Sequence, residues 1–120
     1  MKIFFIISLL FSFSFSSIVS PALKEKILSS YKTKLPIFVD NGIYIVDIDI
    51  VNDVFIYVNS VNLNKVSSFN KMNMYNKRKN DLCSTQYKTL KRGIAYRYDF
   101  YNKRNRESLF SVSISMKDCR

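Results

Sequence analysis

The carboxyl-terminal part of the chain alternates apolar and polar residues in two runs that a basic turn, residues 102–106, connects. An apolar side chain occupies every second position of both runs: Ile94, Tyr96, Tyr98 and Phe100, then Phe110, Val112, Ile114 and Met116. A period of two is typical of a strand with one buried face. The pattern therefore predicts a hairpin that presents one face to the core.

A second hairpin is predicted on either side of a short polar break at Asn52-Asp53. Residues 54–58 are apolar at consecutive positions, so both faces of the strand 54–59 carry apolar side chains. Either this strand is central in the sheet, or the amino-terminal segment covers its second face. In the strand before the break, residues 43–51, one face is apolar and the other polar. The apolar face is expected to hold Tyr44, Val46, Ile48 and Ile50, and the polar face Asp47 and Asp49.

Helical spacing occurs in three other segments. Residues 23–31 predict a short amphipathic helix that ends before Pro36. Residues 64–79 predict a helix capped by Asn64, and Gly93 ends a shorter helix after it. The apolar stripe of the middle helix recurs every third residue: Val66, Phe69, Met72 and Tyr75. Together these elements predict an α+β domain with a four-stranded antiparallel sheet, built from two hairpins, and helices on one face.

The amino-terminal residues 1–22 have the composition of a secretory signal peptide. Lys2 is followed by an apolar run, and Ser20 and Ala22 are small residues in the places that a cut after Ala22 requires. A membrane anchor is the alternative, but a span needs about 20 apolar residues, and serines interrupt this run from Ser12 onward. We expect a periplasmic or secreted protein with one domain, residues 23–120. No cysteine lies at the expected cut to carry a lipid.

The two cysteines, Cys83 and Cys119, both lie in the expected domain. An exported protein meets an oxidising compartment, so we expect the two sulfurs to form one disulfide bond. Free thiols or an intermolecular bridge are the alternatives. A domain of this size has a thin core, and a disulfide would stabilise it.

Nineteen basic and nine acidic residues give the chain a net charge of +10. Such a charge attracts anionic lipid or an acidic partner, and export argues against nucleic acid. The cations form two clusters: Lys77, Arg78 and Lys79, then Lys103, Arg104 and Arg106. One hypothesis is therefore a charge-driven envelope or phage-encoded protein that binds such a partner through these clusters. Solvated turns and helix ends are the alternative interpretation.

Residue types that catalysis commonly uses are missing. The chain has no histidine, so a serine or cysteine nucleophile would lack its usual base. Two glycines exclude a glycine-rich phosphate loop, and two cysteines cannot complete a zinc site. Asp47 and Asp49 are close enough for a carboxylate pair but are better interpreted as a solvent face, because nothing apolar near them would raise a pKa. We expect no enzyme, no metal and no cofactor.

Several short motifs, in this order, resemble those of small exported bacterial proteins that include the pilotin-like proteins of type II secretion, of the β type. The motifs are a cysteine before a short helix, a basic-glycine step into a Tyr-x-Tyr strand, and a terminal Asp-Cys: Cys83, Arg92-Gly93, Tyr96-Arg97-Tyr98 and Asp118-Cys119. The resemblance implies a periplasmic α+β fold with Cys83 and Cys119 paired. It also implies a non-enzymatic protein that binds a segment of an outer-membrane secretin. The stripe of Val66, Phe69, Met72 and Tyr75 is best interpreted as the helix face that packs on the sheet, and the alternative is that these residues form the walls of a peptide groove.

Overall fold

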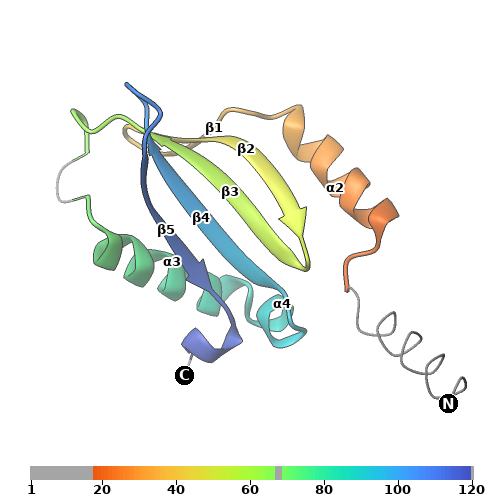
Figure 1. Ribbon diagram of the computed structural model, residues 1–120. Coiled ribbons are helices and arrows are strands. Elements are labelled where there is room, and N and C mark those ends of the chain that lie inside the picture. Colours follow the sequence, from red (N-terminus) through yellow and green to blue (C-terminus); the bar gives the residue numbers. More distant parts are fainter. Residues whose placement is uncertain (1–17, 67–68, 120) are drawn as a thin grey trace, which may run out of the picture.

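The computed structural model describes residues 18–66 and 69–119, which form a five-stranded sheet with helices packed against it (Figure 1). Within these residues no helix is both long and apolar enough to cross a membrane. The elements in chain order are α2 (Pro21–Lys32), β1 (Ile37–Asp40), β2 (Ile43–Val51), β3 (Val54–Val61), α3 (Lys71–Thr85), α4 (Tyr87–Lys91), β4 (Ala95–Asn102), β5 (Ser108–Ile114) and the 3₁₀ helix η1 (Met116–Cys119).

The strands lie in the order β1-β2-β3-β4-β5, and β3 and β4 run parallel while the other neighbours are antiparallel. The α+β class is correct, but the predicted four-stranded antiparallel sheet is wrong. The reason is the connection between β3 and β4, which runs through α3 and α4 and returns the chain to the starting end of β3. Ala95 accordingly pairs with Val54, as parallel strands joined by a helical crossover do.

The fifth strand, β1, was not predicted from the sequence. It follows Pro36 and turns back onto β2 at Asn41 and Gly42, so that Phe38 lies opposite Tyr44. Gly42 has a φ of +89°, which an L side chain rarely adopts. β1 therefore depends on this glycine and on its pairing with β2.

A bulge in β2 changes which residues face the core. The register shifts between Ile45 and Asp47, which places Val46 as an extra residue. Ile48 and Ile50 are buried as expected, but so is Ile43, whereas Tyr44 and Val46 are 40% and 44% exposed. The predicted inward orientation of Tyr44 and Val46 is therefore wrong, because strict alternation does not continue through a bulge.

Helix α3 starts seven residues later than the predicted helix. Its cap is Asn70, whose side chain accepts a hydrogen bond from the Asn73 N–H at 2.9 Å, and not Asn64. Met74, Tyr75 and Leu82 pack toward the sheet from this helix, while Met72 is 65% exposed. The shorter helix α4 ends just before Gly93, as predicted.

One face of the sheet forms the core together with α2, α3 and α4. α2 packs near β2, and α3 packs near β5 (Figure 1). The buried apolar side chains of this cluster are Val19, Ile43, Ile50, Val61, Leu82, Leu90, Ile94, Tyr96, Tyr98, Phe100, Val112 and Ile114.

The predicted disulfide between Cys83 and Cys119 is confirmed. It joins the end of α3 to η1, with the two Cα atoms 5.5 Å apart. The bond therefore holds the carboxyl terminus against the helix that crosses from β3 to β4.

Candidate functional site

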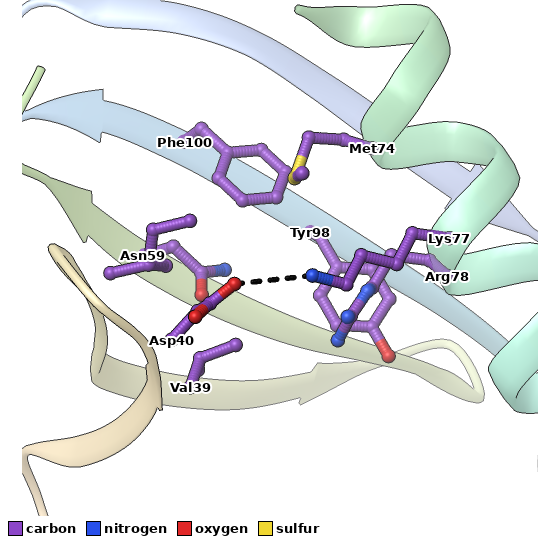
Figure 2. Close-up of a pocket in the computed structure, with 9 residues that line it drawn as sticks. Val39, Asp40, Asn59, Met74, Lys77, Arg78, Tyr98 and Phe100 are labelled. Carbon is purple, nitrogen blue, oxygen red and sulfur yellow. Dashed lines mark hydrogen bonds and ion pairs between the residues drawn. The ribbon is translucent and has the colours of Figure 1, made fainter. Parts of the chain in front are cut away.

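A small cleft lies between β1 and α3 above the sheet (Figure 2). Asn59 from β3 and Phe100 from β4 lie at its base, and Val39 and Met74 face it from β1 and α3. Its volume is about 10 Å³, enough for about one water molecule. In this conformation the cleft is closed to any larger group.

An ion pair crosses the cleft from β1 to α3. The Lys77 ammonium donates to the Asp40 carboxylate at 3.2 Å (Figure 2). The backbone N–H of Asn41 and the Lys77 ammonium hold the pKa of the Asp40 carboxyl below its usual range. Both side chains are about half exposed, so water screens their attraction and the pair can open at little cost.

One polar group beside the cleft lacks a hydrogen-bond partner among the described residues. The Arg78 guanidinium lies over the Tyr98 ring, 5.6 Å from its centroid, and its Nε is buried without a hydrogen-bond acceptor among the described residues. Burial raises the pKa of the Tyr98 hydroxyl to about 12, and Arg78 acts in the opposite direction. The Asn59 amide donates to the Tyr57 carbonyl at 3.1 Å. The Arg78 Nε can donate a hydrogen bond to an acceptor on a bound molecule, so these side chains are suited to binding.

Tyrosine rings form a stacked row on the helix-covered face of β3 and β4. Tyr57 stacks between Tyr96 and Tyr98, with ring centroids 6.3 Å and 5.2 Å apart. Phe55 extends the row beside Tyr96 at 5.5 Å. Burial also raises the pKa of the Tyr57 hydroxyl. The Tyr-x-Tyr motif therefore supplies core packing between strands.

The four residues of the predicted groove lie in different surroundings. Phe69 stacks on Phe110 at 5.0 Å and belongs to the edge of the core. The Tyr75 hydroxyl donates to the Asp118 carboxylate at 2.6 Å. The Met72 side chain is exposed to solvent. Val66 instead packs close to Gly42. Phe69 and Met72 both lie at the amino-terminal end of α3, and their part in peptide binding stays a prediction.

Sequence reasoning missed the residues around the cleft, chiefly Val39, Asn59 and Met74. Their placement depends on β1, whose only sequence signals are Pro36 and the turn residues Asn41-Gly42. An isolated run of four residues does not reveal which strand it will join.

The two basic clusters lie on different elements and have different surroundings. On α3, Lys77 is paired with Asp40, Arg78 lies over Tyr98, and Lys79 lies over the Tyr75 ring at 5.5 Å. At the turn between β4 and β5, no salt bridge to another described residue engages the second cluster, Lys103, Arg104 and Arg106.

Two cations of the turn cluster border an open hollow of about 580 Å³. Lys103 and Arg106 line it together with Val46, Val58 and Tyr101. By strand register, Val58 and Tyr101 point to the side of the sheet opposite Tyr57 and Phe100. The hollow is therefore on the face of the sheet that the helices do not cover.

Among the described residues, no three acidic or cysteine side chains lie close enough together to hold a metal ion. Asp47 and Asp49 each accept a hydrogen bond from the next residue's N–H, and the Asp49 carboxylate lies 3.9 Å from the Lys24 ammonium. Both residues are exposed, so they form part of the solvent face of the sheet.

Comparison with solved structures identifies the fold. The EpsS pilotin of the Vibrio vulnificus type 2 secretion system superposes with a TM-score of 0.70 over 82% of this chain and 90% of that chain, at 13% identity. This chain has the pilotin fold. The type II secretion pilotin AspS of Vibrio cholerae gives a TM-score of 0.67 with the same coverage and 16% identity.

A candidate secreted protein of Pseudomonas aeruginosa shares the same fold. It gives a TM-score of 0.69 at 17% identity over 91% of this chain and 96% of that chain. No model of a known protein family matches the chain, and no curated protein matches it in sequence. The similarity therefore establishes architecture over nearly the whole described domain.

Proposed function

We propose that this chain is a non-enzymatic, pilotin-like binding protein of the cell envelope that holds a peptide of an outer-membrane secretin. The observation that carries the proposal is the fold, which two type II secretion pilotins share over 82% of this chain. The disulfide supports a place outside the cytoplasm, because such bonds persist in oxidising compartments. We place the protein in the periplasm or the medium.

We assign the peptide to the surface at the amino-terminal end of α3. Met72 is 65% exposed there, a larger exposed fraction than that of any other large apolar side chain among the described residues. Phe69, nearby in sequence, packs on Phe100 and Phe110 and gives this surface a rigid aromatic base. Exposed apolar side chains on a rigid base are typical anchors for an amphipathic peptide.

An array of overlapping peptides from the secretin of the same organism, probed with the purified exported protein, tests this function. Binding of one segment should persist at high salt, because apolar contacts are not screened. Met72→Glu should weaken that binding by about tenfold or more. Phe38→Glu is the matched control, since Phe38 is 61% exposed but lies on β1.

Two results would contradict the proposal. Absence of binding to every secretin peptide would contradict the proposed function. Equal binding by the wild type and Met72→Glu would contradict the proposed site. Loss with Phe38→Glu alone would place the peptide on the other side of the sheet. Circular dichroism of both variants checks that each remains folded.

A second candidate function is electrostatic binding of an acidic partner or anionic lipid. The supporting observation is the turn cluster, whose cations border an open hollow beside Val46, Val58 and Tyr101. Sedimentation with anionic vesicles at low salt should then fall steeply as salt rises, since charges are screened over about 8 Å at physiological ionic strength. Lys103→Gln with Arg106→Gln should abolish the binding, whereas Met72→Glu should leave it unchanged.

A further inference from the structure

The residues just before α2 are packed into the domain. Val19 is only 6% exposed and belongs to the same core cluster as Leu90 and Ile94. The Ile18 side chain passes so close to Gly93 that a Cβ at that glycine would lie 3.1 Å from the Ile18 Cδ1. These contacts are those of a folded domain and differ from those expected of a leader that is cut away.

The Asp53 carboxylate holds the backbone of this segment. It accepts hydrogen bonds from the Ile18 N–H at 3.0 and 2.9 Å and from the Val19 N–H at 3.0 Å. Hydrogen bonds to an ionised acceptor are among the stronger ones in proteins. The backbone carbonyl of Asp53 also accepts from the Ala95 N–H at 3.1 Å. One turn residue thus joins the amino-terminal segment to the start of β4.

The beginning of α2 depends on the same segment. The Ser20 hydroxyl accepts from the Leu23 N–H at 3.2 Å, the Ser20 carbonyl accepts from the Lys24 N–H at 2.8 Å, and Pro21 is the first helical residue. A cut after Ala22 would remove this cap. It would also place a positive α-amino group at the helix amino terminus, where the helix dipole disfavours positive charge.

We propose that the leader is removed between Ser16 and Ser17, so that the exported protein comprises residues 17–120. A signal peptidase with one water molecule would hydrolyse the Ser16–Ser17 amide, which leaves Ser16 as a carboxylate and Ser17 with a free α-ammonium group. Ser14 and Ser16 are the small residues that such a cut requires. Because Ser17 stays attached, the Ile18 nitrogen remains an amide N–H that can donate to Asp53.

This site competes with the cut after Ala22 that the sequence pattern favours, and it goes beyond the proposed binding function. A cut directly before Ile18 fits less well, because Phe15 would then occupy a position that needs a small residue. The Ser16–Ser17 bond is the position nearest the domain that satisfies both the peptidase pattern and the contacts of Asp53.

The full-length precursor, expressed with its own leader and recovered from the envelope or medium, tests the proposal by intact mass and amino-terminal sequencing. The expected chain begins at Ser17. Ser16→Leu should make the uncut precursor accumulate, because a bulky residue would stand directly before the cut. Ala22→Leu is the matched control at an exposed position of α2 and should be processed as the wild type is.

A chain that begins at Leu23 or at any residue other than Ser17 would overturn the proposal. So would normal processing of Ser16→Leu together with accumulation of the Ala22→Leu precursor. Neither outcome depends on whether a secretin peptide binds, so the two proposals fail separately.

Discussion

The Tyr75 hydroxyl donates a hydrogen bond of 2.6 Å to the Asp118 carboxylate, which ties α3 to η1 next to the disulfide. The same carboxylate accepts from the Ser115 N–H at 2.8 Å. Burial alone would raise the pKa of the Asp118 carboxyl, but these hydrogen bonds outweigh it, and its pKa lies below the usual range. The carboxyl terminus is thus held by a polar contact as well as by a covalent bond.

Removing the Tyr75 hydroxyl should make the free energy of unfolding depend less on pH in the acid range. A carboxyl with a depressed folded-state pKa contributes stability above its unfolded pKa, near 3.8, and loses it as pH falls through the folded value. Tyr75→Phe should therefore unfold at lower urea concentration at neutral pH. The two urea midpoints should converge as Asp118 becomes protonated. Parallel curves at all pH values would show that the hydrogen bond does not couple to this titration.

Buried tyrosines should make the fold sensitive to alkali. Burial raises the pKa of Tyr98 from 10 in the unfolded chain to about 12, so its contribution is complete below pH 10 and is lost as pH rises through 12. The contribution of Tyr98 to the free energy of unfolding should fall by about 2 kcal/mol when the pH reaches about 12. Tyrosinate absorbance and circular dichroism should change together. Tyr98→Phe should flatten the pH dependence, and an unchanged slope would contradict the assignment.

The disulfide should supply a large part of the stability. Cys83 and Cys119 close a loop with a sequence separation of 36. In the loop-entropy account such a bond contributes about 3 to 4 kcal/mol. Replacing both cysteines by alanine should lower the free energy of unfolding by about this amount in urea titrations. A difference of less than about 1 kcal/mol would show that the unfolded chain gains little freedom without the bond.

The turn before β2 should tolerate no side chain at Gly42. A Cβ there would lie 2.9 Å from the Val66 Cγ2 and 3.0 Å from the Lys65 Cβ, at a φ of +89°. Gly42→Ala should cost about 1 to 3 kcal/mol by strain and crowding. Gly93→Ala is the control, because its φ is also positive but its Cβ would approach only the end of the Ile18 side chain. Equal urea midpoints for the two variants would contradict the role of crowding.

Local patterns in the sequence predicted much of the fold because they depend on neighbouring residues. Alternation in β4 and β5 placed Tyr96, Tyr98, Val112 and Ile114 in the core correctly. Gly93 ends α4 as expected, since a positive φ is needed there. The pairing of Cys83 with Cys119 was predicted because the chain has two cysteines and its sequence predicts export.

The candidate site was less accessible from sequence. Phe69 and Met72 are spaced as on one face of a helix with Tyr75, yet Asn70 caps α3, so Phe69 precedes the helix and Met72 in its first turn is exposed. The cleft near Asp40 and Lys77 depends on contacts between segments far apart in the chain. Periodicity describes one element and contains no information on which second element will lie against it.

The sequence by itself determined the class of the domain, the position of most strands and the disulfide, because these depend on local periodicity and on residue type. Only the tertiary structure decided that β3 and β4 are parallel, that β1 completes the sheet and that Val46 forms a bulge. Strand direction depends on where a helical crossover returns the chain, and register depends on the pairing of backbone groups. Both are settled by packing across the whole domain.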